Sequence, residues 1–244
     1  MPLLVDPSHH YFTSRYGPSH SPDGSIQNTR FSAFYDIAGI TEDPVAFRKV
    51  VELLVRRYKA ATDAGYGPTK IAGFEPRGFI FGTAVAVQLG IPFVMIGKAG
   101  RLPGVLASSG QHDSRNQDNE AVMRLGSVGK GDRVVVVDDL IATGGTAVAG
   151  LGLVDSLGAE VYEFAAVMAP DALGGVARIH SHDAGRFAAV PVFTLLEDGT
   201  VQTLRDHKMD YTPPEGTPRK LTPEQARNFS LKIPGGGGDV PSWP

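Results

Sequence analysis

The sequence predicts an α/β fold built on a doubly wound, mainly parallel sheet. Two observations carry this prediction. Short apolar runs alternate with helical patterns through the middle of the chain, as in folds whose parallel strands are joined by helices. The run at residues 134–137 consists entirely of valine, which is typical of a strand that is buried on both faces.

Local signals define the individual elements in chain order. Asp43 and Pro44 have the residue types of an N-cap and a first helical position, so a helix is expected to begin there. Its apolar face is formed by residues spaced three or four apart, namely Phe47, Val50, Val51, Leu54 and Tyr58. The other expected helices are 78–89, which stops at Gly90 before Pro92, and 146–157, which stops at Gly158. The other expected strands are 71–74, 93–96, 161–168 and 192–196.

Composition divides the 244 residues into three parts. Residues 31–205 carry the apolar periodic segments and are long enough to form one core. Residues 1–30 are rich in proline, serine and histidine, and we expect an N-terminal arm there. Residues 206–244 are rich in proline and glycine, which predicts an extended C-terminal tail.

Charge and composition exclude several classes of protein. The formal net charge of −3 and the pI of about 6.2 argue against a nucleic-acid-binding surface. Cysteine is absent, which excludes disulfides, zinc–thiolate sites and cysteine nucleophiles. No apolar run approaches the roughly 18 residues of a membrane span, and the N-terminus lacks a secretory pattern. We therefore expect a cytoplasmic protein with no membrane partner.

The most informative segment follows the valine run. Asp138 and Asp139 place two adjacent carboxylates at the end of this strand, and residues 142–146 then read Ala-Thr-Gly-Gly-Thr. The glycines allow a tight turn in which several N–H groups converge on one anion, and the N-terminus of the following helix adds partial positive charge. Thr143 and Thr146 supply hydroxyl donors. This pattern predicts a cradle for a phosphate monoester.

The residues around this cradle limit the class of ligand that it could bind. The loop has neither the Gly-Lys pattern of a Walker loop nor the three-glycine pattern of a dinucleotide site. Asp138 and Asp139 disfavour a second phosphate nearby, but they suit the vicinal hydroxyls of a sugar, directly or through a divalent cation. A phosphorylated sugar is therefore the favoured ligand.

At these residues the sequence resembles the type I phosphoribosyltransferases, whose signature is an apolar strand, two acids and a Thr-Gly-Gly or Thr-Gly-Lys loop. Three other segments are similar to the adenine phosphoribosyltransferases: Glu75-Pro76-Arg77-Gly78-Phe79, Lys98-Ala99-Gly100-Arg101-Leu102-Pro103-Gly104, and Phe34-Tyr35-Asp36-Ile37 with Thr41-Glu42-Asp43-Pro44. The resemblance covers about residues 31–198, and Arg178-Ile179-His180-Ser181 with Tyr211-Thr212 is most similar to the trypanosomatid members. It implies the type I phosphoribosyltransferase fold, with a small N-terminal hood and an extended C-terminal arm.

This resemblance also implies an activity and a site. The reaction is transfer of 5-phosphoribosyl from phosphoribosyl pyrophosphate to adenine, giving AMP and pyrophosphate, with Mg²⁺ carried by the substrate and not by a metal site of the protein. The implied 5-phosphate ligands are Ala142, Thr143, Gly144, Gly145 and Thr146. The implied pyrophosphate ligands are Glu75, Pro76, Arg77, Lys98 and Arg101, with Glu75–Pro76 as a candidate cis peptide. The implied adenine contacts are Ala33, Phe34 and Leu140, and the implied catalytic residues are Arg77, Asp138, Asp139 and Glu120.

Base preference and the lid both bear on the substrate. Ala142 stands where the hypoxanthine-guanine enzymes carry an acid, which favours adenine. The lid after residue 104 departs from the family, because the usual Glu-Tyr pair is missing from residues 105–125, a polar stretch expected to be a flexible loop. Arg115 stands near the position of the expected acid, and the candidates to replace it are Asp113, Asp118, Glu120 and His112. Gly97 replaces the family's arginine before Lys98, and Tyr35 replaces a common basic residue.

These departures leave two alternatives beside an active adenine enzyme with a rearranged lid. One is a non-catalytic protein of the same fold that binds nucleotide or phosphoribosyl pyrophosphate and acts as a regulator or partner of an active paralogue. The other is a phosphoribosyltransferase that uses a different base. In each case the resemblance implies a homodimer.

Overall fold

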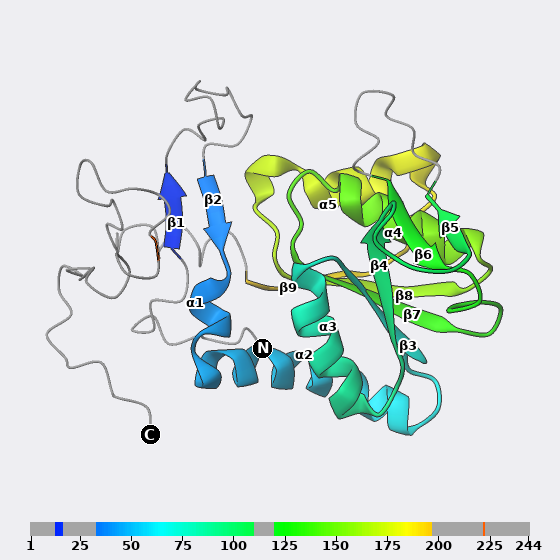
Figure 1. Cartoon of the computed structure of the whole chain (residues 1–244), viewed down its shortest axis with the longest axis horizontal. Helices are drawn as coiled ribbons and strands as arrows, with labels where there is room; N and C mark the ends of the chain where they lie inside the picture. The colour runs from blue at the N-terminus through cyan, green and yellow to red at the C-terminus, as the bar shows by residue number, and fades with distance from the viewer. Residues whose placement is uncertain (1–12, 17–32, 110–119, 197–221, 223–244) are drawn as a thin grey trace, which may run out of the picture.

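The structure is a computed structural model that describes residues 13–16, 33–109, 120–196 and 222. Its centre is a seven-stranded sheet with the order β5-β6-β4-β3-β7-β8-β9 (Figure 1). The strands are β3 (Lys70–Phe74), β4 (Phe93–Lys98), β5 (Leu106–Ser108), β6 (Ala121–Arg124), β7 (Arg133–Leu140), β8 (Glu160–Met168) and β9 (Val192–Leu196). Neighbours among β4, β3, β7, β8 and β9 pair in parallel, whereas β6 pairs antiparallel with both β4 and β5. The predicted doubly wound, mainly parallel sheet is confirmed.

The helices begin and end largely where local chemistry predicts. They are α1 (Ala38–Thr41), α2 (Pro44–Asp63), α3 (Arg77–Leu89), α4 (Gly145–Ser156) and α5 (Gly175–Ser181), with 3₁₀ turns η2 (Asp171–Leu173) and η3 (His182–Gly185). The Asp43 carboxylate caps α2 by accepting from the N–H groups of Val45 at 2.7 Å and Ala46 at 3.0 Å. Gly90 ends α3 in the left-handed conformation, with φ of 69°. In the part of the chain that is described, no helix is both long and apolar enough to cross a membrane.

The valine run explains why both faces of the sheet are covered. Val134 and Val136 belong to the core under α4, while Val135 and Val137 belong to the core under α2 and α3. Alternate side chains of one strand therefore anchor the two helical layers that Figure 1 shows on either side of the sheet. On α2, the expected face is confirmed for Val51, Leu54 and Tyr58, whereas Phe47 and Val50 are only partly buried.

A small second sheet precedes the core. Strand β1 (Thr13–Tyr16) pairs antiparallel with β2 (Ala33–Asp36), with Thr13 opposite Asp36. The sequence patterns did not indicate β1, which lies within the segment expected to be an arm, because four residues are too few to show a period. The expected C-terminal tail, residues 206–244, lies outside the described residues except for Thr222.

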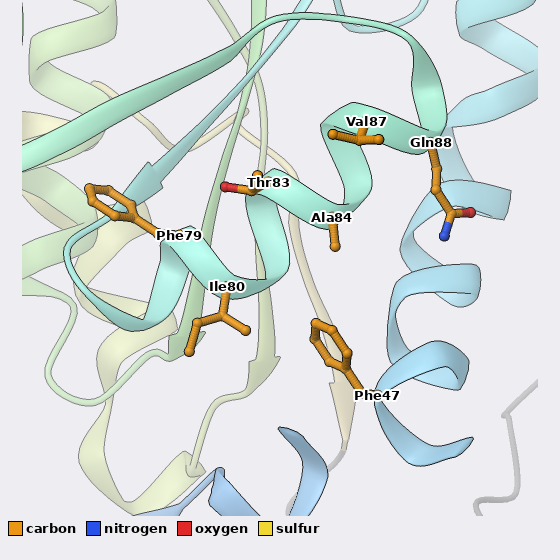
Figure 2. A pocket seen from close by; sticks show the side chains of 7 residues that line it. All are labelled: Phe47, Phe79, Ile80, Thr83, Ala84, Val87 and Gln88. Atoms are coloured by element: carbon orange, nitrogen blue, oxygen red, sulfur yellow. The ribbon is translucent and has the colours of Figure 1, made fainter. Parts of the chain in front are cut away.

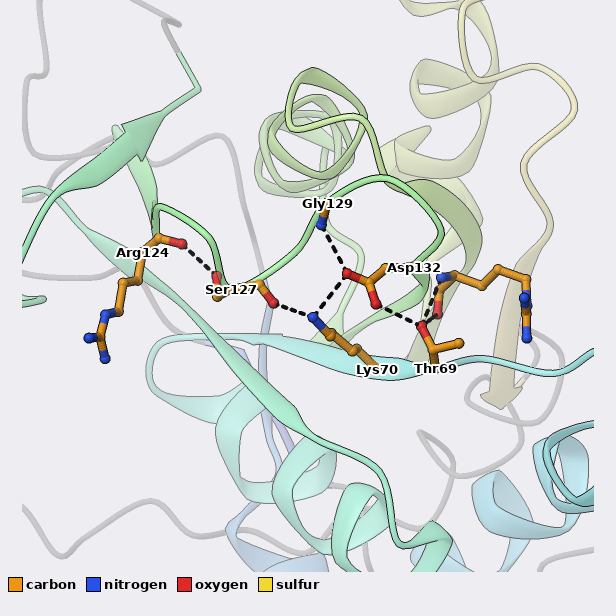
Figure 3. Close-up of polar contacts among 7 residues, drawn as sticks. Thr69, Lys70, Arg124, Ser127, Gly129 and Asp132 are labelled. Carbon is orange, nitrogen blue, oxygen red and sulfur yellow. Dashed lines mark hydrogen bonds and ion pairs between the residues drawn. The ribbon is translucent and has the colours of Figure 1, made fainter. Parts of the chain in front are cut away.

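A polar network ties the strands together at the edge where β3 and β7 begin (Figure 3). The Lys70 ammonium contacts Asp132 Oδ2 at 2.9 Å and donates to the Ser127 carbonyl at 2.7 Å. The Gly129 N–H also donates to Asp132, at 2.9 Å. Burial tends to raise the pKa of Asp132, but the hydrogen bonds from Lys70 and Gly129 and the charge of Lys70 outweigh it and lower this pKa. The network supports the sheet from the edge opposite the carboxyl ends.

A buried ion pair fastens α2 to the sheet. Glu163 on β8 is 3% exposed, and its carboxylate accepts from Arg57 Nε at 2.8 Å and from the Tyr58 hydroxyl at 2.5 Å. The Arg57 guanidinium also stacks 4.0 Å from the centre of the Phe193 ring. Burial and, next, the charge of Glu163 raise the pKa of Tyr58, so the hydroxyl stays protonated and donates. These contacts hold α2 against β8 and β9.

Candidate active site

The predicted site residues converge where β3 and β7 end, side by side. The connection from β3 through α3 leads to β4 on one side, and the connection from β7 through α4 leads to β8 on the other. This is the point where strand order reverses, and ligands of doubly wound sheets bind there, beyond the carboxyl ends of the strands. The loop after β3 carries Glu75, Pro76 and Arg77, and β7 ends with Asp138, Asp139 and Leu140.

The loop between β7 and α4 forms a tight turn. Gly144 has φ of 77°, a conformation that favours glycine, and α4 begins directly after it. No side chain caps α4, so the first N–H groups of this helix have no side-chain acceptor. Thr143 and Thr146 are exposed at the same turn. The turn thus has the conformation expected of the anion cradle, whose binding of phosphate stays a prediction.

Asp138 and Asp139 form a largely buried acid pair, and Arg77 lies beside Asp139. Asp139 is 5% exposed, and its Oδ2 lies 3.0 Å from Arg77 Nη1. The Asp139 N–H donates to Asp138 Oδ1 at 2.9 Å. Burial, and then repulsion from Asp139, raise the pKa of Asp138 well above its ordinary value. The two carboxylates thus lie in contact with each other, and Arg77 pairs with one of them.

Gly78 allows the start of α3 to lie close to the end of β7. A Cβ at Gly78 would stand 2.5 Å from the Val137 carbonyl and 3.4 Å from Asp138 Oδ1. The start of α3 thus packs directly on the end of β7, which brings Arg77 within reach of Asp139. This explains in physical terms why a glycine follows Arg77.

The expected pyrophosphate residues also gather at this edge. The Glu75–Pro76 bond is cis, as the sequence analysis anticipated. Glu75 accepts from the Lys98 N–H at 3.4 Å, and its carboxylate lies 4.0 Å from Arg101 Nη1. Lys98 and the largely exposed Arg101 thus stand beside the loop that carries Arg77.

The departure at Gly97 has a structural reason. A Cβ at this position would lie 2.9 Å from Leu102 Cγ and 3.4 Å from Glu75 Oε2. Leu102 therefore packs into the space that a larger residue needs. An arginine at position 97 would require the Leu102 side chain to move.

The described ends of the lid contain strands that the sequence did not indicate. Residues 105–125 were expected to be a flexible polar loop, but β5 and β6 pair within this stretch, and Ala121, Val122 and Met123 are buried. The Glu120 carboxylate accepts a hydrogen bond from the Ser108 hydroxyl, and the Glu120 carbonyl accepts from the Ala99 N–H at 3.2 Å. The expectation of a loop throughout is thus wrong at both ends, where the strands are too short to produce a recognisable period. The other lid candidates, His112, Asp113, Arg115 and Asp118, lie outside the described residues.

The adenine side is described only in part. Leu140 is half-buried against the core under α2 and α3. Ala33 and Phe34 lie on β2, and the positions of their side chains are outside the described part of the structure. The stacking expected between Phe34 and a purine therefore stays a prediction.

Sequence reasoning missed one wall of the cradle, the start of α5. A Cβ at Gly144 would stand 2.5 Å from the Gly175 carbonyl, and a Cβ at Gly175 would stand 2.3 Å from the Ala142 carbonyl. The Arg178 guanidinium donates to the Thr143 carbonyl at 3.4 Å. The Gly174-Gly175 pair was a signal for this close packing, because adjacent glycines often mark a close approach of two backbones.

Comparison with known proteins defines the class first. Residues 37–194 match the family model described as "Phosphoribosyl transferase domain". A curated adenine phosphoribosyltransferase of Histophilus somni (strain 2336) is 38% identical over 180 residues, which covers 74% of this chain and 90% of that protein. The corresponding protein of Methylobacterium sp. (strain 4-46) is 45% identical over 164 residues, covering 67% of this chain and 84% of that protein.

Solved structures agree with this class. The adenine phosphoribosyltransferase of Trypanosoma brucei, solved with AMP, pyrophosphate and ribose-5-phosphate, has a TM-score of 0.75 at 32% identity, covering 90% of this chain and 89% of that chain. The enzyme of Leishmania donovani has a TM-score of 0.75 at 33% identity with the same coverages. The chain belongs to the adenine phosphoribosyltransferase family, and its likeness to trypanosomatid members agrees with the sequence analysis.

Proposed function

We propose that this chain is an adenine phosphoribosyltransferase that converts adenine and phosphoribosyl pyrophosphate to AMP and pyrophosphate. The observation that carries the proposal is the convergence of three features at one sheet edge. These are the Thr143–Thr146 turn, the Asp138–Asp139 pair and Arg77. They place an anion cradle, acceptors for sugar hydroxyls and a cation at the same sheet edge, in a chain of this family.

The turn at 142–146 is proposed to hold the 5-phosphate through its N–H groups and the hydroxyls of Thr143 and Thr146. The phosphate does not react, so its binding serves to fix the sugar in one orientation. Asp138 and Asp139 then meet the ribose hydroxyls, because both acids stand at the end of β7, directly before the turn.

Arg77 connects the ribose side of the site with the pyrophosphate side. It is positioned by Asp139, and its side chain is 39% exposed at the start of α3. In our proposal the guanidinium neutralises the charge that develops on the leaving pyrophosphate, together with Lys98 and Arg101. The bond from the anomeric carbon to pyrophosphate breaks, an imidazole nitrogen of adenine bonds to that carbon, and the adenine proton is released.

Mg²⁺ is proposed to enter with phosphoribosyl pyrophosphate. Asp138 and Asp139 offer oxygen ligands, which suit this ion. Held together with oxygens of the substrate, the ion would supply further neutralisation of the leaving group. The two aspartates are the residues that would contact it or its water ligands.

Adenine is proposed to bind between Phe34 and Leu140, with Ala33 beside it. Ala142 leaves the cradle without the acid that serves oxopurines, which favours adenine. Glu120 is the described lid acid, and its hydrogen bond from Ser108 places it at the base of the lid, beside Ala99. We assign the base proton to this carboxylate as the working hypothesis.

A homodimer is also proposed, with a second copy of this chain on the outer face of α3. An apolar groove of about 610 Å³ lies there, lined by Phe47, Phe79, Ile80, Thr83, Ala84, Val87 and Gln88 (Figure 2). Val87 is 75% exposed and Ile80 is 40% exposed, which is unusual for residues of their type. Light scattering tests this assembly: a monomer at micromolar concentration contradicts it. The cytoplasmic location expected from the sequence stays a prediction.

The test of the proposed activity is AMP formation by the purified chain with adenine, phosphoribosyl pyrophosphate and Mg²⁺. Wild-type protein is expected to turn over, and Asp139→Asn is expected to weaken binding of phosphoribosyl pyrophosphate because it removes a charged hydroxyl acceptor. Folded wild-type protein that binds AMP without forming it would instead support the non-catalytic alternative.

A further inference from the structure

Helix α5 forms a wall of the phosphate cradle, and its start is fitted to the turn without space for a side chain. Gly144 and Gly175 face each other so closely that a Cβ on either meets the opposite backbone at 2.5 Å or less. Ile141 Cγ2 would also stand 2.8 Å from a Cβ at Gly175. Any residue one turn further along α5 is therefore held in a fixed relation to residues 142–146.

Arg178 occupies that position. Its Nη1 atom lies 3.4 Å from the Thr143 carbonyl oxygen, and the same atom lies 3.5 Å from the place of a Cβ at Gly145. The guanidinium thus lies beside Thr143 in the turn and Gly145 at the start of α4. Arg178 is itself exposed, so it does not depend on the core for its position.

The charge of Arg178 is not neutralised by an acid among the described residues, where its guanidinium has the Thr143 carbonyl as its hydrogen-bond acceptor. Arg186, also exposed and only eight residues further along, is different. It pairs with Asp155 through Nε at 2.9 Å and lies 3.8 Å from Asp183. A full positive charge therefore stands at the rim of the cradle, whereas the neighbouring one is compensated.

The cradle needs such a charge. Residues 140–148 contain no lysine or arginine, and Arg77 is already paired with Asp139. A phosphate monoester carries a charge of about −1.5 to −2 near neutral pH, whereas backbone N–H groups and hydroxyls contribute only dipoles. Arginine suits phosphate because its planar guanidinium can donate two parallel hydrogen bonds.

We propose that Arg178 is a phosphate-binding residue, whose guanidinium pairs with the 5-phosphate of phosphoribosyl pyrophosphate and of AMP while that phosphate occupies residues 142–146. This inference rests on the proposed function, since it assigns a further ligand to the same phosphate. It also gives α5 a role, as the element that carries a cation to a cradle that has none of its own.

The test compares AMP with adenosine, which lacks the phosphate, by calorimetric titration of the full chain. Arg178→Gln is expected to weaken AMP binding about tenfold, the low end for hydrogen bonds to a charged group, and to leave adenosine affinity unchanged. Arg178→Lys keeps the charge but loses the planar pair of donors, so AMP binding is expected to fall between that of wild type and that of Arg178→Gln. Arg186→Gln is the matched control, because it removes an exposed arginine that is already paired, and AMP affinity is expected to be unchanged.

Two results overturn the inference while the proposed function stands. One is wild-type AMP affinity in Arg178→Gln. The other is an equal loss for AMP and adenosine, which, with a lowered melting temperature, would show a purely structural role. Wild-type protein that does not prefer AMP to adenosine would contradict the proposed function itself, and this inference with it.

Discussion

Gly175→Ala tests whether the start of α5 sets the geometry of the phosphate cradle. The added Cβ would stand 2.3 Å from the Ala142 carbonyl oxygen, whereas ordinary contact begins near 3.4 Å. Either α5 or the turn must therefore move by about 1 Å, because both contacting groups are backbone or tightly packed. The nearest atom is a backbone oxygen, which cannot move aside as the end of a side chain can.

A displacement of this size is expected to lower the catalytic rate strongly. A misplacement of about 1 Å in a positioning element costs on the order of 100-fold in rate. We therefore predict that kcat/KM for phosphoribosyl pyrophosphate falls about 100-fold and that AMP binds more weakly. Overpacking also lowers the free energy of unfolding, by roughly 1–3 kcal/mol.

Steady-state kinetics with AMP titration and thermal unfolding measure both effects. Gly152→Ala is the matched control, because Gly152 lies within α4 and a Cβ there meets nothing within 4 Å. It is expected to keep wild-type kinetics and to gain about 0.5–1 kcal/mol of stability. Gly144→Ala places a Cβ 2.5 Å from the Gly175 carbonyl, across the same boundary between the turn and α5, and is also expected to lose activity. A folded Gly175→Ala protein with kcat/KM within about threefold of wild type would refute the reasoning.

Three other predictions concern charges in the structure. Arg77→Ala should lower turnover at least about tenfold, equal to 1.4 kcal/mol, because the leaving group loses a cation and Asp139 loses its partner; a smaller loss in steady-state turnover would place Arg77 outside the reaction. Glu163→Ala should lower the free energy of unfolding by about 2 kcal/mol and the melting temperature by about 6 °C, because Arg57 and a buried hydroxyl lose their acceptor; calorimetry showing less than about 1 °C would contradict this. Asp132→Asn should lose stability in urea unfolding above about pH 4, and the difference from wild type should fade as the pH falls through the lowered pKa of Asp132; a difference that does not depend on pH would exclude its charge as the cause.

The fold was predictable from sequence wherever a signal was repeated or chemically distinct. The valine run, the Asp43-Pro44 start and the Gly90 stop each have one physical interpretation, and the structure confirms all three. Strands β5 and β6, of three and four residues, are too short to show a period, so a polar loop was expected in their place.

The sequence indicated which candidate site residues follow β3 and β7, but not all the contacts that they make. Chain order places Arg77 and Asp139 after two strands, but their ion pair depends on how closely α3 can approach β7, which Gly78 decides. The contribution of α5 was missed for a similar reason. A close contact between two backbones is marked in a sequence only by a glycine. The reason for Gly175 becomes clear when the structure shows the Ala142 carbonyl beside it.

The most direct test of the central claim is product analysis from a mixture of bases. Purified chain receives equal adenine, hypoxanthine and guanine with phosphoribosyl pyrophosphate and Mg²⁺, and nucleotides and pyrophosphate are quantified together. The account predicts AMP as the product, with one pyrophosphate released for each AMP. Formation of IMP or GMP in comparable amounts, or no nucleotide from protein that binds phosphoribosyl pyrophosphate, would contradict it.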